Sequence, residues 1–344
     1  MPDIINGGLA DASNAALLTA VLLYAVGMLA YACDFAFRKE RLAAPATAQV
    51  PELVGAAAGS PGGGAAPEAP EPPAGPAHPA ATGPASLWPS GFWLRTAFGL
   101  TCAGLLAHLV AIVTRGLAEH RVPWGNMYEF IMAIAGMAIV VLVAVSVRFR
   151  AYYIGLFVLV PVVFALALDV TVVYTPAGSL VPALNSYWIA IHVTAMIVAS
   201  GLFVVGAVTT VMYLAAERNE RRLAAGLPSR TAGLLVHLPG TTVLDRLAYR
   251  TILFAFPVWT FGIMAGAIWA DHAWGRYWGW DPKETWSFIT WVVYAGFLHA
   301  RATAGWRGRR AAYIQLVGFG CLMFNLIGIN LWVTGLHSYA GMPH

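Results

Sequence analysis

Residues 128–147 read YEFIMAIAGMAIVVLVAVSV, a run of twenty positions whose single charged side chain is Glu129. At a rise of 1.5 Å per residue, about 20 apolar residues of helix cross a hydrocarbon core roughly 30 Å thick. Eight runs of this kind predict an all-α, polytopic membrane protein with about eight transmembrane helices. We place these runs at residues 14–36, 92–114, 128–147, 152–173, 187–214, 251–270, 286–302 and 312–334.

The composition of the 344 residues agrees with a membrane location. Of these residues 59% are hydrophobic and 10% are charged, with a mean hydropathy of +0.68. A soluble globular domain has about 25% charged residues, so the composition argues against a water-soluble enzyme. The net charge of +4 is not a sign of nucleic-acid binding. The charged residues are better interpreted by their positions between the apolar runs, and we expect no nucleic-acid partner. The three cysteines form no Cys-x-x-Cys pair, which disfavours thiol–disulfide chemistry and a zinc site.

Three regions follow from the pattern of hydropathy. Residues 1–37 hold an N-terminal transmembrane helix, and residues 92–344 hold a seven-helix membrane domain. Residues 38–91 between them are rich in Ala, Pro and Gly, a composition that buries too little apolar surface to offset ordering entropy, so we predict a disordered cytoplasmic linker. No secretory signal is expected, since residues 1–16 contain two acids and no Lys or Arg.

The basic residues predict how the chain is oriented. Sixteen of the twenty Lys and Arg residues fall on one side of the eight predicted spans. By the positive-inside rule this side is cytoplasmic. Both termini then lie outside, and we predict a multi-pass protein of the bacterial cytoplasmic membrane.

The segment between the sixth and seventh runs is unusually aromatic. Residues 274–286 read WGRYWGWDPKETW, with four Trp and one Tyr in thirteen positions. An aromatic belt at the membrane interface is one explanation. The other is a flat ligand that stacks on the indoles of Trp274, Trp278 and Trp280, with glycines between them that let the backbone approach.

The end of this segment also predicts a helix start. Asp281, Pro282 and Glu284 fit the N-cap, first and third positions of the seventh helix, where acids suit the positive end of the helix dipole. This structural role is compatible with a ligand-facing role for the tryptophans.

Three histidines occupy positions suited to binding iron. His192 lies near the outer end of the fifth run and His337 just beyond the outer end of the eighth, so both reach the side of the Trp-rich segment. Two neutral imidazoles approaching a flat aromatic pocket from opposite directions are what axial ligation of a haem iron requires, although interfacial hydrogen bonding is the simpler role. His299 lies about thirteen residues into the seventh run, where an ionisable group indicates a function or a helix–helix hydrogen bond.

Other polar residues have less specific expectations. His108 in the second run is more simply a packing residue than a ligand, and Asn325 and Asn330 in the last run are expected to hydrogen-bond across helices. Some of the outer cations are expected to hold the two haem propionates, and the sequence leaves open which. These cations are Arg115, Arg121, Arg276 and Lys283.

Several segments resemble one protein family. Residues 274–284, WGRYWGWDPKE, resemble the Trp-rich "WWD" signature of haem-handling proteins in cytochrome c maturation. Residues 186–192, 298–301 and 335–339 resemble more narrowly the CcsA/ResC (CcsB) type of system II cytochrome c biogenesis proteins. Residues 123–129, PWGNMYE, are similar to an outward loop of that family, and the resemblance covers roughly residues 100–344.

This resemblance implies a haem-transporting and haem-presenting subunit of a cytochrome c synthase, or haem lyase, whose enzymatic role depends on a ResB-like membrane partner. Haem b is the implied cargo, and an apocytochrome c with a Cys-x-x-Cys-His motif is the implied acceptor. A thioredoxin-like, thiol-reducing protein could serve as a further partner.

The resemblance also implies roles for particular residues. His192 and His337 would be the outer axial ligands, and His299 would be one ligand of a haem held within the membrane. Four residues of the Trp-rich segment would contact the outer haem, namely Trp274, Trp278, Trp280 and Asp281.

Three alternative functions stay open at this point. A system I haem-handling protein shares the WWD signature. A membrane redox subunit of the cytochrome b type commonly has two histidines in one helix, and none of the eight runs contains such a pair. A solute transporter would use the tryptophans only as a belt, and it would be expected to show internal repeats, which we do not find.

Overall fold

The computed structural model describes residues 5–37, 89–178, 184, 186–228 and 238–337. These residues form helices and connecting segments, with no β-strand among them, which confirms the all-α prediction. The predicted disordered linker lies outside the described residues except for its last three positions, 89–91.

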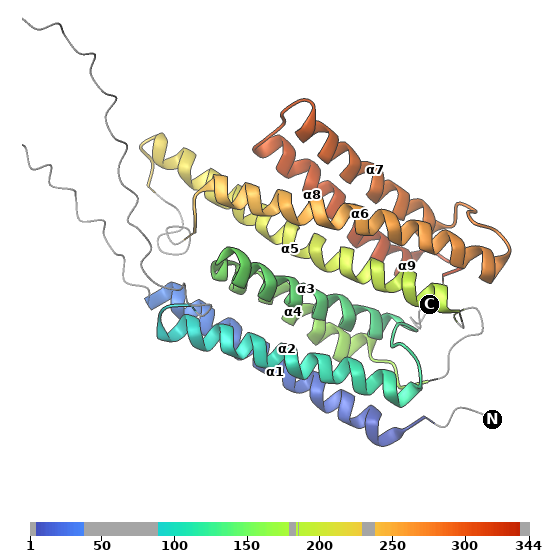
Figure 1. The fold of residues 1–344 in the computed structure, drawn as a ribbon. Coiled ribbons are helices and arrows are strands. Elements are labelled where there is room, and N and C mark those ends of the chain that lie inside the picture. The colour runs from blue at the N-terminus through green and yellow to red at the C-terminus, as the bar shows by residue number, and fades with distance from the viewer. Residues whose placement is uncertain (1–4, 38–88, 179–183, 185, 229–237, 338–344) are drawn as a thin grey trace, which may run out of the picture. The chain divides into compact units, whose positions relative to one another are not determined.

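Figure 1 shows the helices of the described chain. They are α1 (Gly7–Phe37), α2 (Phe92–Glu119), α3 (Met127–Phe149), α4 (Gly155–Leu168), α5 (Tyr187–Ala224), α6 (Thr241–Trp274), α7 (Pro282–Ala302), α8 (Arg309–Met323) and α9 (Ile329–Trp332). A 3-10 turn, Tyr152–Ile154, precedes α4. The π-helical turn Asp169–Val173 follows α4, and a second π-helical turn, Phe324–Gly328, joins α8 to α9.

Seven segments of the described chain are long and apolar enough to cross a membrane. They are α1, α2, α3, Tyr152–Val173, α5, α6 and Arg309–Trp332, and they correspond to seven of the eight predicted runs. The remaining run, 286–302, is α7, which has 21 residues and runs alongside α8. It is less apolar than the seven, so its membrane crossing stays a prediction.

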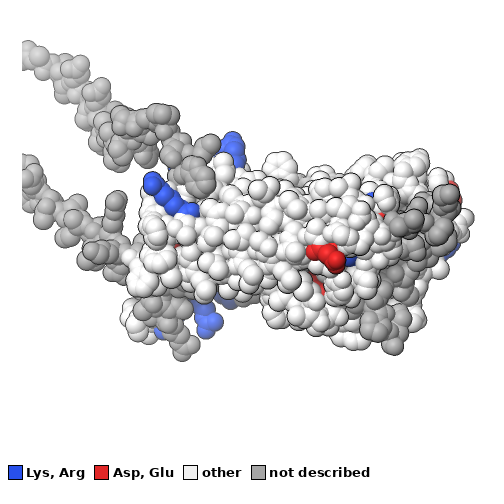
Figure 2. Space-filling view, turned by 90° about the horizontal axis from the view of Figure 1, so that it is seen from below, with Lys and Arg blue, Asp and Glu red and all other residues white. Residues whose placement is uncertain are grey.

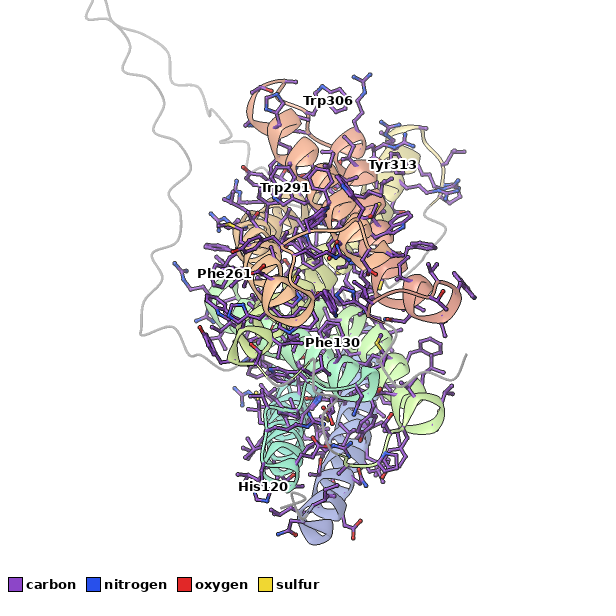
Figure 3. The ribbon with its side chains drawn as sticks, turned by 90° about the vertical axis from the view of Figure 1, so that its right-hand side faces the viewer. His120, Phe130, Phe261, Trp291, Trp306 and Tyr313 are labelled. Carbon is purple, nitrogen blue, oxygen red and sulfur yellow. The ribbon has the colours of Figure 1, made fainter. Side chains whose placement is uncertain are left out.

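The helices pack in sequential pairs around two apolar cores. Helix α1 packs mainly on α2, α5 on α6, and α7 on α8. One core lies mostly among α1–α4, and the other, among α5–α8, includes the stacked rings of Phe203 and Tyr294 at 4.1 Å. Phe130 of α3 packs against this second core, and Figure 3 shows it between the α1–α2 pair and the α7–α8 pair.

The connections place particular segments at the same end of the helices. The first turn of α1, the residues between α6 and α7, and the end of α9 lie at one end (Figure 1). The backbone N–H of Asn6 donates to the carbonyl of Ala118 at 3.1 Å, which joins the start of α1 to the end of α2 there. On the face shown in Figure 2, most Lys and Arg gather towards the opposite end, and much of the surface between carries no charge.

Candidate functional site

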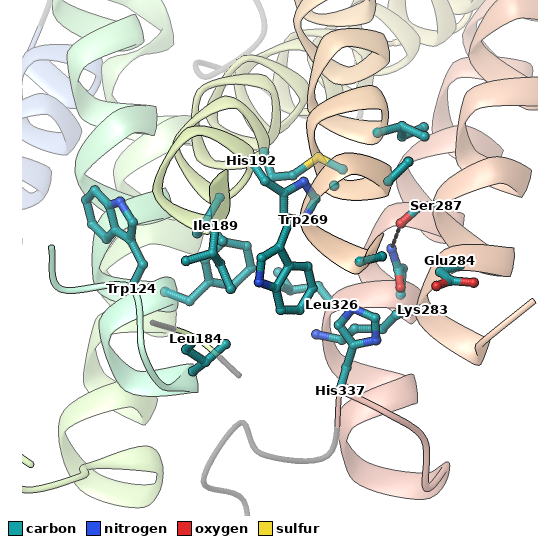
Figure 4. A pocket seen from close by; sticks show the side chains of 18 of the residues that line it. Trp124, Leu184, Ile189, His192, Trp269, Lys283, Glu284, Ser287, Leu326 and His337 are labelled. Atoms are coloured by element: carbon teal, nitrogen blue, oxygen red, sulfur yellow. Dashed lines mark hydrogen bonds between the residues drawn. The ribbon is translucent and has the colours of Figure 1, made fainter. Parts of the chain in front are cut away.

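A pocket opens at the end of the helices that carries the Trp-rich segment (Figure 4). It holds about 1150 Å³ of empty space, a volume that includes the part open to solvent. Most of its wall is apolar, with aromatic rings from Trp124, Phe130, Trp259, Trp269, Trp274, Tyr277 and Trp278. Its polar side chains with hydrogen-bonding or charged groups include Asn126, His192, Ser200, Lys283, Glu284, Ser287, Asn325 and His337.

His192 reaches this pocket from α5 with a fixed orientation. Its Nδ1 lies 2.7 Å from the backbone oxygen of Gly262 on α6. A carbonyl oxygen can only accept, so Nδ1 carries the hydrogen and the lone pair is on Nε2. The helices meet closely here, since a Cβ built on Gly266 would lie 2.6 Å from Cε1 of His192. Gly262 and Gly266 thus form a Gly-x-x-x-Gly contact that accommodates the imidazole.

His337 follows α9 and is held by Asp281 at the start of α7. Its Nδ1 lies 2.8 Å from Asp281 Oδ2, and the backbone N–H of Leu336 donates to Asp281 Oδ1 at 2.7 Å. Burial lowers the pKa of His337, although Asp281 opposes this, and the imidazole is therefore neutral at pH 7. Nδ1–H donates to the carboxylate and Nε2 carries the lone pair. Histidines that bind metals are commonly oriented by a carboxylate in this way.

Asp281 also begins α7, which confirms the helix start predicted from the sequence. Its carboxylate accepts from the backbone N–H of Lys283 at 3.3 Å, and the carboxylate of Glu284 accepts from the backbone N–H of Asp281 at 3.1 Å. Burial raises the pKa of Asp281, but hydrogen bonds from His337 and Leu336 outweigh burial and hold it below its usual value. One ionised side chain therefore caps a helix and orients an imidazole.

Trp269 of α6 lies between the two histidines in Figure 4. Its ring is nearly parallel to His192, with centroids 6.1 Å apart and an angle of 8°, and its centroid lies 5.8 Å from that of His337. Sequence reasoning missed this residue because it precedes the Trp-rich segment. Its spacing from Gly262 and Gly266 at i, i+4 and i+7 on one helix face is the signal that could have found it.

The predicted aromatic residues do not all face the pocket. Trp274, the last residue of α6, and Trp278 line it, and Trp274 lies 5.1 Å from the ring of His337. Trp280 is 66% exposed and is not among the residues that line the pocket. Its φ of 60° is strained for a bulky residue, and its ring packs on Trp278 and on Phe288 of α7.

The structure does not bring His299 to the other two histidines. It is exposed on α7, eighteen residues after Asp281, which corresponds to about 27 Å along a helix. His299 and His337 are therefore too far apart to bind the same iron, because Asp281 holds His337 at the start of α7.

Two of the outer cations are engaged elsewhere, in a buried ion cluster between α2 and α3. Arg115 Nε lies 3.0 Å from Glu119 Oε1 and 3.2 Å from Glu129 Oε1, and Arg121 Nη1 lies 2.8 Å from Glu129 Oε2. Neither arginine lines the pocket. Glu129 also accepts from the backbone N–H of Gly125 at 2.7 Å, so the cluster fixes the loop whose Trp124 forms one pocket wall.

The polar residues of the last run make the cross-helix contacts expected of them. Asn325, in the π-helical turn, donates from Nδ2 to Ser287 Oγ of α7 at 2.9 Å, and Asn330 donates to the sulfur of Met127 of α3 at 3.4 Å. His108 is buried in α2, with Nδ1 3.3 Å from the hydroxyl of Tyr24, consistent with a packing role.

Comparison with known proteins gives matches in both sequence and fold. Residues 123–337 match the family described as "Cytochrome C assembly protein". Proteins named "Cytochrome c biogenesis protein CcsA" are similar: that of Guillardia theta is 34% identical over 254 residues, covering 70% of this chain and 84% of the relative. That of Gloeobacter violaceus is 33% identical over 306 residues, covering 72% and 90%.

A solved structure has a similar fold. The protein named "Cytochrome c Heme Lyase CcmF" aligns with a TM-score of 0.59 at 16% identity, covering 92% of this chain and 46% of that chain. At this identity the likeness concerns the fold alone.

Together, the fold and the pocket define a polytopic helical membrane protein with an aromatic-lined pocket between its helices. The chain belongs to the cytochrome c assembly protein family, as a protein of the CcsA type. Its role is therefore in cytochrome c maturation.

Proposed function

We propose that this protein holds haem b in the pocket of Figure 4, with His192 and His337 as axial ligands of the iron. The observation that carries the proposal is the fixed orientation of the two imidazole rings. Each ring is held in place through its Nδ1, which donates to Gly262 O in His192 and to Asp281 Oδ2 in His337, and metal-binding histidines are commonly oriented in this way.

The walls of the pocket support a flat, largely apolar ligand. Trp274 and Trp278 supply indole faces and edges, and aromatic rings favour offset or edge-to-face contact with other π systems. Trp269 lies between the imidazoles, so we expect its indole to shift or to stack on the macrocycle when haem enters.

The haem is presented at the outer membrane face to an apocytochrome c with a Cys-x-x-Cys-His motif. The histidine of the acceptor displaces one axial ligand, and each cysteine S–H adds across one vinyl group. Sulfur bonds to the inner vinyl carbon and the hydrogen goes to the terminal carbon, so no electrons are gained or lost. This chemistry needs reduced thiols, which a thioredoxin-like partner would supply, and the contribution of the pocket is positioning.

The protein acts as one subunit of a system II cytochrome c synthase in the bacterial cytoplasmic membrane. Its CcsA relatives are named as cytochrome c biogenesis proteins, which supports a role in the assembly of cytochrome c. His299 binds a second haem within the membrane. Its exposed position on α7 leaves room for a ResB-like subunit to supply the other ligand.

The test is the absorption spectrum of the protein purified in mild detergent with its ResB-like partner. We expect a low-spin, b-type haem spectrum that His192→Ala and His337→Ala weaken, with a parallel loss of cytochrome c assembly. His272→Ala is the matched control, because His272 is an exposed histidine at the same end of the molecule that does not line the pocket. A well-folded wild-type protein that stays haem-free under haem-replete expression would contradict the proposal.

A further inference from the structure

Lys283 is the only Lys or Arg among the described residues that line the pocket. It sits in the first turn of α7, and Figure 4 shows its side chain extending alongside His337 into the pocket. An ammonium group in a mostly aromatic cavity is costly to desolvate unless an anion accompanies it.

The nearby carboxylates are engaged with other hydrogen-bond donors. Asp281 accepts from His337 and from Leu336 through its two oxygens. Glu284 accepts from the backbone N–H groups of Gly279 at 2.8 Å and Asp281 at 3.1 Å. Neither forms an ion pair with Lys283 within 4.0 Å among the described residues. A ligand anion is the partner that this geometry lacks.

Two further polar residues accompany Lys283. Ser287 lies one turn further along α7, at i+4, and therefore on the same helix face. Its Oγ accepts from Asn325 Nδ2, which leaves the serine hydroxyl hydrogen able to donate. The Oδ1 of Asn325 is buried and has no hydrogen-bond partner in the described part of the chain. This part of the pocket wall thus combines the cation of Lys283 with a hydroxyl group from α7 and an amide group from the π-helical turn.

We propose that Lys283, accompanied by Ser287, binds a propionate carboxylate of haem and so sets which edge of the macrocycle faces the interior of the pocket. This inference rests on the proposed haem-binding function. A carboxylate suits the site because charge-assisted hydrogen bonds from an ammonium are short and strong, and more so where water is excluded. The vinyl edge, which lies across the ring from the propionates, then points away from α7.

Binding of haem and of haem dimethyl ester to the purified full-length protein tests this contact. The ester keeps the iron and the ring but carries no carboxylate charge. We expect wild-type protein to bind haem at least about tenfold more tightly than the ester, as a charged hydrogen bond predicts. Lys283→Met should lose this preference and bind the ester as the wild type does, and Lys283→Arg should restore much of the preference.

Arg276→Met is the matched control. Arg276 belongs to the same segment, but its guanidinium faces Glu284 at 4.0 Å and it does not line the pocket. An unchanged preference in Lys283→Met, an equal affinity of wild-type protein for haem and ester, or an equal loss in Arg276→Met would overturn the assignment to Lys283. If wild-type protein binds neither compound, the haem-binding function itself fails, which is a different result. A low-spin spectrum of the ester bound to Lys283→Met shows that the variant is folded.

Discussion

Asp281 links the start of a helix to the orientation of a histidine. A residue at this position must accept from the backbone to begin α7, and here it also accepts from His337 Nδ1. The same carboxylate therefore fixes where α7 starts and which nitrogen of His337 carries the hydrogen. Replacement by alanine would remove both effects at once and could not separate them.

Asp281→Asn separates the two roles. Asparagine is about as good an N-cap as aspartate, but its single oxygen cannot also accept from Leu336 N–H, so we expect the free energy of unfolding in detergent to fall by about 1 kcal/mol. The neutral amide accepts more weakly from His337, and haem affinity should fall by roughly 10- to 100-fold. Haem titration alongside thermal unfolding measures both quantities. Unchanged haem affinity would show that Asp281 acts only as a cap.

A pH dependence is expected from Lys283, which lies ahead of the predicted span 286–302. Burial lowers the pKa of this ammonium to about 8, and Asp281 opposes the shift. The other ionisable groups around it are Glu284 on α7, His337 after α9 and His192 on α5.

The preference for haem over its dimethyl ester should therefore weaken as the pH rises above about 8, where the free protein loses the ammonium charge. A bound carboxylate stabilises the charged form, so binding above this pH takes up a proton. Lys283→Arg keeps its charge and should show a flat preference over the same range. A preference in the wild type that does not depend on pH would contradict this expectation.

At the scale of helices, the contact between α5 and α6 decides where His192 lies. Gly262 receives its hydrogen bond, and Gly266 leaves the space that the imidazole occupies. Small residues four positions apart let two membrane helices approach closely, and here they position a polar ring between the helices.

Gly266→Ala should disturb this position without unfolding the protein. The added Cβ would lie 2.6 Å from the imidazole, so His192 must move away from Gly262. We expect a weaker or altered low-spin haem spectrum at a near-normal yield of folded protein. Gly296→Ala on α7 is the matched control, because a Cβ there meets nothing within 4 Å. An unaltered spectrum in Gly266→Ala would argue against ligation by His192.

The helix ends show what hydropathy does and does not detect. The apolar run of the sixth predicted span ends at residue 270, but α6 continues to Trp274 and ends where Gly275 adopts a φ of 69°. Helix α5 likewise extends to Ala224, ten residues past its predicted end. Hydropathy marks the apolar length, whereas the helix stops at a capping residue, so the two boundaries differ.

For the whole molecule, the alternation of helices puts the start of α1, the α6–α7 connection and the end of α9 at one end (Figure 1). This arrangement agrees with an even number of crossings if α7 spans the membrane. With the basic residues concentrated on the other side, the pocket would open to the outside.

Cysteine labelling tests this topology. In a background with Cys33, Cys102 and Cys321 changed to serine, a membrane-impermeant maleimide applied to intact cells should label His272→Cys but not Ala304→Cys. Leu227→Cys, between α5 and α6, should behave like Ala304→Cys, since both positions are exposed on the predicted inner side. Labelling of residues 272 and 304 from the same side would show that α7 does not cross the membrane.

The sequence by itself determined the class of this protein and the start of α7. Apolar length predicts helices across a membrane because backbone groups in lipid must be satisfied within the segment. Asp281, Pro282 and Glu284 predict a helix start because capping is local in sequence. The residues of the WWD signature pointed to the family that the comparisons show.

Only the tertiary structure decided what faces the pocket. His192 and His337 are 145 positions apart in the chain and meet around Trp269, whereas Trp280 turns away and His299 lies near the other end of α7. Arg115 and Arg121 are engaged in a buried ion cluster, and Lys283 points inward. Such choices depend on helix rotation and on long-range hydrogen bonds, and neither is encoded in the spacing of residues along one segment.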